Sequence, residues 1–130
     1  MTSNSKNNII KVAIADDHAL FKKGIKLALS MYRDIEIIME ADNGSDLLNK
    51  LKMMQPDIIL LDLQMPIIDG ATVLPVIRDN YPGIKIIILS LNSNDILIPQ
   101  LLDLWASSFL TKTDEPAVMY KKITDSYYNK

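Results

Sequence analysis

The sequence predicts an α/β protein built on a doubly wound, five-stranded parallel sheet with strand order 2-1-3-4-5. Five short apolar runs alternate along the chain with segments whose apolar residues recur at helical spacing. The runs at 58–61 and 84–89 are apolar at nearly every position, which is typical of strands buried on both faces of a parallel sheet. Because crossovers between parallel strands are right-handed, helices are expected on both sides of the sheet.

The strands are expected where the apolar runs occur, each bounded by polar or turn-forming residues. Their expected ranges are 11–15, 35–41, 58–62, 84–89 and 107–110. The helices between and after them are expected at 18–33, about 47–55, 71–80, 96–105 and about 113–127. Pro75 and Pro99 fall inside two of these helices. We expect a bend or a late first turn at each, because proline has no backbone N–H to donate.

The length and composition favour one soluble domain. We expect residues 1–8 to be a disordered polar tail and residues 9–130 to form the domain. The formal charge of −2 and the isoelectric point near 5.3 provide no basic surface for DNA or for an anionic membrane. Cysteine is absent, which excludes disulfides, thiolate nucleophiles and cysteine-based zinc sites. The tail has no apolar segment like that of a signal peptide, so we expect a cytoplasmic protein.

Acidic residues follow or close two of the predicted strands. Asp16 and Asp17 follow the first strand, and Asp62 closes the third. With this strand order, the carboxyl ends of strands one and three meet at the ligand-binding switch point, so the three carboxylates should converge. Three carboxylates about 4 Å apart need a counter-charge, and an all-oxygen ligand set favours Mg²⁺ or Mn²⁺ over zinc.

Two further polar residues follow the fourth and fifth strands. Ser90 and Lys112 should face the same cavity, where they would add a hydroxyl and a positive charge beside Asp62. A metal cation, an ammonium and a hydroxyl around one carboxylate oxygen form a suitable site for a phosphoryl group. Phosphoryl transfer depends mainly on in-line positioning and on neutralising the phosphoryl oxygens, and these groups supply both.

Taken together, the motifs resemble the receiver domain of two-component response regulators over residues 9–128. They are Asp16-Asp17, the loop from Asp62 to Gly70 with the sequence Asp-Leu-Gln-Met-Pro-Ile-Ile-Asp-Gly, Ser90, and the run from Phe109 to Lys112. The segment from Ile14 to Ile25 further resembles receivers of the NarL/LuxR type. The resemblance implies a flavodoxin-like receiver fold.

The resemblance also implies a role for each matching residue. Asp62 would accept a phosphoryl group from a phosphohistidine on a sensor histidine kinase. Mg²⁺ would be bound by Asp62 and Asp17 directly, by Asp16 largely through water, and by the Gln64 carbonyl. Lys112 would pair with a phosphoryl oxygen.

A switch and an output are implied in the same way. Ser90 would move toward the phosphoryl group and Phe109 would turn inward, which changes the surface of the fourth helix, fifth strand and fifth helix. The domain would control transcription through a C-terminal DNA-binding domain absent from this chain, and a homodimer is left open. It would not be an enzyme beyond its own phosphorylation and slow autodephosphorylation. Residues 104–108 and Pro99 depart from the usual NarL-type pattern, so we expect an unusual output surface.

Several alternatives stay open from the sequence. The chain could be a stand-alone receiver that relays to a protein partner, or a phosphatase with an aspartyl nucleophile, although haloacid dehalogenase-type enzymes have a second acid where this chain has Gln64. The apolar helix at 96–105, which ends at Trp105, could be core or could present a protein-docking patch. His18, the only histidine, has no second histidine for a metal pair and is assigned no catalytic role.

Overall fold

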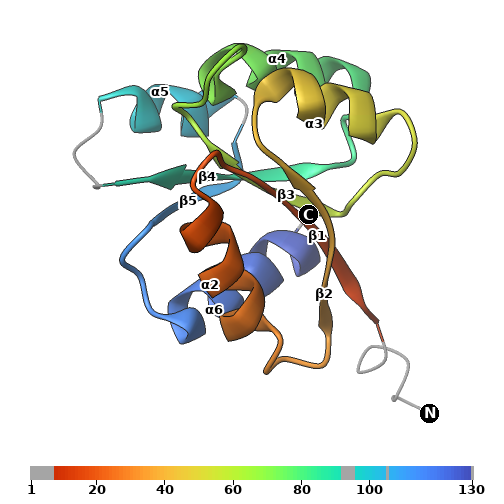
Figure 1. The fold of residues 1–130 in the computed structure, drawn as a ribbon, viewed down its shortest axis with the longest axis vertical. Coiled ribbons are helices and arrows are strands. Elements are labelled where there is room, and N and C mark those ends of the chain that lie inside the picture. Colours follow the sequence, from red (N-terminus) through yellow and green to blue (C-terminus); the bar gives the residue numbers. More distant parts are fainter. Residues whose placement is uncertain (1–7, 92–95, 105, 130) are drawn as a thin grey trace.

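The computed structural model describes residues 8–91, 96–104 and 106–129. Within these residues, a five-stranded parallel sheet in the order β2-β1-β3-β4-β5 forms the centre of the molecule, and helices cover both faces (Figure 1). The predicted α/β fold and strand order are therefore confirmed. The strands are β1 (Ile10–Ala15), β2 (Ile35–Ala41), β3 (Ile58–Asp62), β4 (Lys85–Ser90) and β5 (Ser108–Thr111). The helices are α2 (Ala19–Leu29), α3 (Gly44–Leu51), α4 (Gly70–Asn80), α5 (Leu97–Leu104) and α6 (Pro116–Tyr128).

The core consists of two apolar clusters, one on each face of the sheet. Helices α3, α4 and α5 cover one face, and α2 and α6 cover the other (Figure 1). Successive residues of a strand point to opposite faces, so Ile59 and Leu61 belong to the first cluster while Ile58 and Leu60 belong to the second. All four side chains are fully buried. This double burial explains why β3 is apolar at every position before its terminal acid.

Two helices end earlier than the sequence predicts. Helix α2 ends at Leu29 rather than near residue 33, and the Ser30 hydroxyl donates a hydrogen bond to the Leu27 carbonyl at 2.6 Å. Helix α3 ends at Leu51, and the Gln55 side chain donates to the carbonyl of that residue at 2.9 Å. In both cases a polar side chain satisfies a carbonyl that the end of the helix leaves without an intrahelical partner.

Pro75 in α4 and Pro99 in α5 occupy different positions in their helices. Helix α4 begins at Gly70, so the late first turn expected from Pro75 is wrong. Asp69 caps this helix by accepting a hydrogen bond from the backbone N–H of Thr72 at 2.8 Å. Pro99 is the third residue of α5, a position whose N–H has no intrahelical partner, so a proline costs little there.

The loop between β3 and α4 folds back closely on the end of β3. The backbone N–H of Gly70 donates to the Leu63 carbonyl at 3.0 Å, and a Cβ at Gly70 would lie 2.0 Å from the Asp62 carbonyl oxygen. Only glycine permits this approach. The left-handed residue of the loop is Ile67, with φ of 70°. A β-branched residue is disfavoured in that conformation, so the loop holds strain at Ile67.

Helix α5 is attached to the core by its apolar residues. Ile98 and Leu101 are buried, and Leu102 is partly buried against the cluster on that face. Ile98 is therefore a core residue rather than part of a docking patch. Trp105 and residues 1–7 of the predicted tail lie outside the described residues.

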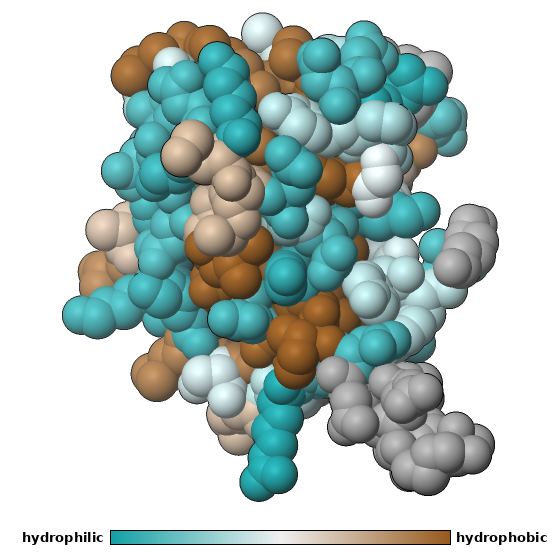
Figure 2. Space-filling model, turned by 90° about the vertical axis from the view of Figure 1, so that its right-hand side faces the viewer, coloured by the Kyte–Doolittle hydropathy of each residue, from teal (hydrophilic) through white to brown (hydrophobic). Residues whose placement is uncertain are grey.

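Among the described residues, no helix has the length and apolar character needed to cross a bilayer. The side of the molecule drawn in Figure 2 is mainly hydrophilic, with its hydrophobic residues in separate patches. A mixed surface of this kind is usual, because polar residues are too few to cover a folded domain completely.

Candidate functional site

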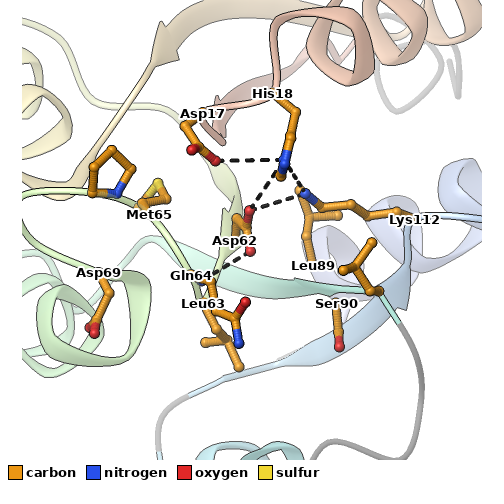
Figure 3. Close-up of a pocket in the computed structure, with 12 residues that line it drawn as sticks. Asp17, His18, Asp62, Leu63, Gln64, Met65, Asp69, Leu89, Ser90 and Lys112 are labelled. Carbon is orange, nitrogen blue, oxygen red and sulfur yellow. Dashed lines mark hydrogen bonds and ion pairs between the residues drawn. The ribbon is translucent and has the colours of Figure 1, made fainter.

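The carboxyl ends of four strands supply the side chains of the site. Asp16 follows β1, Asp62 ends β3, Ser90 ends β4 and Lys112 follows β5. Because the strands are parallel, these ends lie at one edge of the sheet, where Asp62, Ser90 and Lys112 line a cavity of about 560 Å³ (Figure 3). The same rule about parallel strand ends predicted from the sequence that these residues meet, and the structure brings them together.

Asp62 is held by one backbone and one side-chain donor. Its side chain is buried; Oδ1 accepts a hydrogen bond from the Gln64 backbone N–H at 3.0 Å, and Oδ2 accepts one from Lys112 Nζ at 3.0 Å. Burial disfavours the charged carboxylate and raises the pKa of Asp62 above its usual value, although the two donors act in the opposite direction. The carboxylate is thus desolvated, with one oxygen facing the cavity and the lysine.

Lys112 lies between two carboxylates. Its Nζ is 2.7 Å from Asp16 Oδ2 and 3.0 Å from Asp62 Oδ2, and it lies 4.9 Å from the ring centroid of Phe21. Burial by itself would lower the pKa of Lys112, but the hydrogen bonds and charges of the two carboxylates outweigh burial and raise it. The backbone N–H of Lys112 also donates to the Ser90 carbonyl at 2.8 Å, which ties β5 to the end of β4.

Asp16 and Asp17 differ in exposure. Asp16 is completely buried, and its Oδ1 accepts a hydrogen bond from the backbone N–H of His18 at 2.8 Å. Asp17 is exposed and lines the cavity. The buried acid therefore supports the end of β1, while its neighbour is open to solvent and to ions.

His18 belongs to the site although sequence reasoning left it out. It is the N-cap residue of α2, and its Nδ1 lies 2.9 Å from Asp16 Oδ1, 3.5 Å from Asp17 Oδ1 and 3.0 Å from Lys112 Nζ (Figure 3). The signal that could have found it is its place directly after two acids at a strand end. The chain has no second histidine, so the sequence pattern alone gives His18 no metal pair and no catalytic role.

Gln64 and Ser90 border the same cavity. The Gln64 side chain is exposed, and Ser90 is buried at the end of β4. Figure 3 shows both on the side of Asp62 away from His18. Gln64 also fixes Asp62 through its backbone, so its position matters even apart from its side chain.

Phe109, the predicted switch residue, lies on β5 outside the cavity. It is partly buried and packs against the cluster beneath α3, α4 and α5. Lys122 of α6 holds it at the sheet edge, with Nζ 2.8 Å from the Phe109 carbonyl oxygen and 4.7 Å from the ring centroid. The sequence did not indicate this lysine.

The donor set fits a hard divalent cation. One ligand atom from each of Asp16, Asp17, His18 and Asp62 lies within 4.8 Å of the others. Three of these four groups are carboxylates, the type of ligand that Mg²⁺ prefers. The site can therefore gather anionic oxygens around a cation, with Lys112 as a second positive charge.

Fold and site together define an α/β protein whose carboxylate cluster and lysine share one end of a parallel sheet. The chain belongs to the response regulator receiver domain family, whose family model matches residues 12–124. The family indicated by the sequence is thereby confirmed.

Relatives and solved structures agree with this assignment. The chain is 32% identical over 123 residues to a probable transcriptional regulatory protein NarL of Mycobacterium tuberculosis, covering 95% of this chain and 57% of that protein. It is 30% identical over 112 residues to the transcriptional regulatory protein DegU of Brevibacillus brevis, covering 86% of this chain and 48% of that protein. The chain thus spans about half the length of these relatives.

Among solved structures, the signal receiver domain of the putative response regulator NarL from M. tuberculosis superimposes with a TM-score of 0.86 at 30% identity, covering 95% of this chain and 99% of that one. The isolated REC domain of RcsB from Salmonella enterica serovar Typhimurium, determined with the phosphomimetic BeF3-, gives 0.85 at 28% identity, with 95% and 91% covered. These comparisons place the chain with receivers of the NarL type.

Proposed function

We propose that residues 9–130 form a phosphorylation-activated switch in which Asp62 accepts a phosphoryl group. The donor would be a phosphohistidine on a sensor histidine kinase or a small phosphodonor. The observation that carries this proposal is the pair of contacts from Lys112 Nζ to Asp62 and Asp16, at 3.0 and 2.7 Å. A lysine held at the nucleophilic oxygen by a second, buried acid is positioned to receive a phosphoryl oxygen.

In the transfer step, Asp62 Oδ2 attacks the phosphorus in line with the leaving nitrogen. The new O–P bond forms as the P–N bond of the phosphohistidine breaks, and the electron pair of that bond stays on the imidazole nitrogen, which takes up a proton. Lys112 neutralises one of the phosphoryl oxygens. Asp62 Oδ1 keeps its hydrogen bond from Gln64, which orients the attacking oxygen.

The acidic residues would hold Mg²⁺, which neutralises negative charge on the phosphoryl group when bound. Asp17 is exposed at the cavity and suits a direct ligand, whereas Asp16 is completely buried and suits contact through water. The Asp62 carboxylate and the Gln64 backbone carbonyl would complete the protein ligands. All of these are oxygen donors, in agreement with the ligand preference of Mg²⁺.

Phosphorylation would be read out through Ser90 and Phe109. Ser90 ends β4 at the cavity. Phe109 lies on the neighbouring strand β5, outside the cavity. Movement of the hydroxyl toward the phosphoryl group would make room for the ring to turn inward. The equilibrium would then shift between two forms of the α5, β5 and α6 surface.

The output would be control of transcription through a DNA-binding domain outside this chain, in a protein that acts in the cytoplasm and can form a homodimer. The relatives named as transcriptional regulators match this chain over only 48% and 57% of their length, which supports this reading. A stand-alone relay to a protein partner is the alternative. Self-catalysed loss of the phosphoryl group would reset the switch.

The test is phosphorylation by acetyl phosphate with Mg²⁺, followed by mass spectrometry of the intact protein. The wild-type chain should gain one phosphoryl group that hydroxylamine removes, and Asp62→Asn should gain none. Asp79→Asn is the matched control, because Asp79 is an exposed acid away from the site and should leave the reaction unchanged. An unmodified wild-type chain, or modification of the Asp62→Asn variant to the same extent, would contradict the proposal.

A further inference from the structure

The inference concerns Lys122 of α6, whose side chain reaches Phe109 on β5. The Phe109 ring packs against the apolar cluster beneath α3, α4 and α5, whereas α6 covers the opposite face of the sheet (Figure 1). Lys122 Nζ nevertheless lies 2.8 Å from the Phe109 carbonyl oxygen and 4.7 Å from the ring centroid. The lysine therefore passes round the outer edge of β5 and contacts both the backbone and the ring of one residue.

The Phe109 carbonyl lies on the side of β5 that faces away from the sheet. β5 is the last strand of the sheet, with β4 as its neighbour. The backbone N–H of Thr111, two residues further on, donates to the Asp114 side chain at 2.9 Å rather than to β4. Backbone groups two residues apart along a strand point the same way, so Phe109 also directs its carbonyl outward. Lys122 supplies the partner that a neighbouring strand would otherwise provide.

The charge of Lys122 acts mainly on the Phe109 ring. In the part of the chain that the structure describes, Lys122 forms no ion pair, and the nearby acid Asp125 pairs with Lys121 instead, at 3.0 Å. Lys122 and Phe109 are both partly buried. An ammonium beside an aromatic ring is attracted by the negative face of the ring, and the attraction grows where water is partly excluded. The orientation of the ring therefore depends on this lysine.

We propose that Lys122 is a positioning residue that holds the Phe109 ring in its resting orientation and so sets how readily the domain responds to phosphorylation. The inference rests on the proposed function, in which the ring turns inward when Asp62 is phosphorylated. Inward rotation takes the ring away from the ammonium, so the resting form has an attraction that the phosphorylated form lacks. The carbonyl contact is compatible with both forms, because it involves only the backbone.

The first test measures the affinity of the full chain for the phosphomimetic BeF3- in the presence of Mg²⁺. Lys122→Met keeps the length of the side chain and removes its charge. The affinity should rise about two- to fivefold, the ratio that corresponds to the usual strength of a lysine–aromatic contact near the surface. Lys122→Arg should keep the wild-type affinity, since a guanidinium also stacks on aromatic rings. An unchanged affinity in Lys122→Met would overturn the proposal.

Lys121→Met is the matched control, because it removes the adjacent lysine, which is exposed and pairs with Asp125. Its affinity for BeF3- should equal that of the wild type. A rise as large as that in Lys122→Met would mean that the net charge of α6, and not the contact with the ring, sets the response. The proposal would then be wrong.

The position of the ring can be followed directly, because the chain has two phenylalanines. Labelling with 4-fluorophenylalanine should give two fluorine resonances in the NMR spectrum, and the one missing from Phe109→Leu belongs to Phe109. Without BeF3-, this resonance should shift in Lys122→Met toward its position in the wild type bound to BeF3-. If it does not shift and the variant only unfolds more easily, Lys122 merely caps the edge carbonyl, which contradicts the proposal.

A double-mutant cycle separates the ring from the carbonyl. In the Phe109→Leu background, Lys122→Met should not change the affinity for BeF3- further, because the ring contact is already absent. An equal rise in both backgrounds would show that the effect passes through the backbone, and the assigned role of the ring contact would be wrong.

Failure of this inference can be told apart from failure of the proposed function. If the wild type binds BeF3- and its Phe109 resonance moves, but neither result depends on Lys122, the role of the lysine is wrong and the phosphoryl switch stands. If the wild type does not bind BeF3- in the presence of Mg²⁺, the proposed function is wrong and this inference fails with it.

Discussion

Lys112 Nζ lies 2.7 Å from Asp16 Oδ2, and the acid it pairs with has no exposed surface. Removing this ammonium would leave two desolvated carboxylates, Asp16 and Asp62, facing each other. We expect Lys112→Met to lower the free energy of unfolding in metal-free buffer by about 2 kcal/mol or more, since a buried acid loses its partner. Urea unfolding measures this.

The control for that prediction is Lys121→Met, which removes an exposed lysine paired with Asp125 at 3.0 Å. The loss should be below about 0.5 kcal/mol, because exposed ion pairs contribute little. Added Mg²⁺ should recover part of the stability lost in Lys112→Met and none in the control. Equal losses in both variants would contradict the proposed electrostatic role of Lys112.

Asp62→Asn should stabilise the domain at neutral pH in metal-free buffer. Burial raises the pKa of Asp62 above 3.8, so its stabilising contribution is fully present below about pH 4 and is lost as pH rises through the folded-state pKa. The amide cannot ionise and escapes that loss. We expect the free energy of unfolding to rise by about 1 kcal/mol at pH 7. Gains of this size are common when a destabilising functional group is replaced.

Urea unfolding at several values between about pH 4 and pH 7 checks the sign of this dependence. The advantage of Asp62→Asn over the wild type should grow as the pH rises. A variant that is less stable than the wild type at pH 7 would show that the hydrogen bonds from Gln64 and Lys112 outweigh the cost of burying the carboxylate.

The site was predictable to the extent that it depends on strand ends. A parallel sheet puts the carboxyl ends of its strands at one edge, so the places of Asp16, Asp62, Ser90 and Lys112 followed from apolar runs alone. The ring of His18 was not predictable in this way, because its direction depends on side-chain rotation and on partners from three other elements.

Two further features lay beyond sequence patterns. Lysine is usually exposed on a helix surface, yet Lys22 of α2 is buried and pairs with Asp42, whose pKa it lowers through a hydrogen bond and its charge. A long side chain can lie along the apolar surface and still reach an acid outside it. The left-handed residue of the β3–α4 loop is Ile67, although an Asp-Gly pair such as Asp69-Gly70 is the more usual turn signal.

Gly70→Ala should destabilise the fold strongly. The added Cβ would lie 2.0 Å from the Asp62 carbonyl oxygen, a backbone atom that cannot move without displacing the end of β3. We expect a loss of about 3 kcal/mol or more, or a failure to fold. Gly24→Ala is the matched control, because nothing lies within 4 Å of its new Cβ, and it should stabilise α2 by about 0.5–1 kcal/mol. Thermal unfolding of the two variants should shift in opposite directions.

Ile67→Asn should stabilise the domain. Ile67 has φ of 70° and a side chain that is 79% exposed, so the replacement relieves strain and removes almost no packing. Asparagine tolerates the left-handed conformation, and the expected gain is about 1 kcal/mol. Ile67→Val keeps the β-branch and should give no gain. If valine stabilised the domain as much as asparagine does, the gain would come from the smaller exposed apolar side chain and not from relief of backbone strain.

Tyr120→Phe should lower stability at neutral pH and converge with the wild type at high pH. The Tyr120 hydroxyl donates to Asp34 Oδ2 at 2.7 Å, and the ring stacks on Tyr32 at a centroid distance of 4.0 Å. Phenylalanine keeps the stack and loses the hydrogen bond, which should cost about 1 kcal/mol.

The hydrogen bond to Asp34, with smaller contributions from burial and nearby charge, raises the pKa of Tyr120 to about 12. Its stabilising contribution is therefore fully present below pH 10, the ordinary tyrosine value, and is lost as pH rises toward 12. Urea unfolding at about pH 7 and about pH 11 should show the difference between the two proteins shrinking. In Asp34→Asn, the tyrosine that ionises at the highest pH in the wild type should ionise at a lower pH, as followed by absorbance. A titration curve identical to that of the wild type would contradict this assignment.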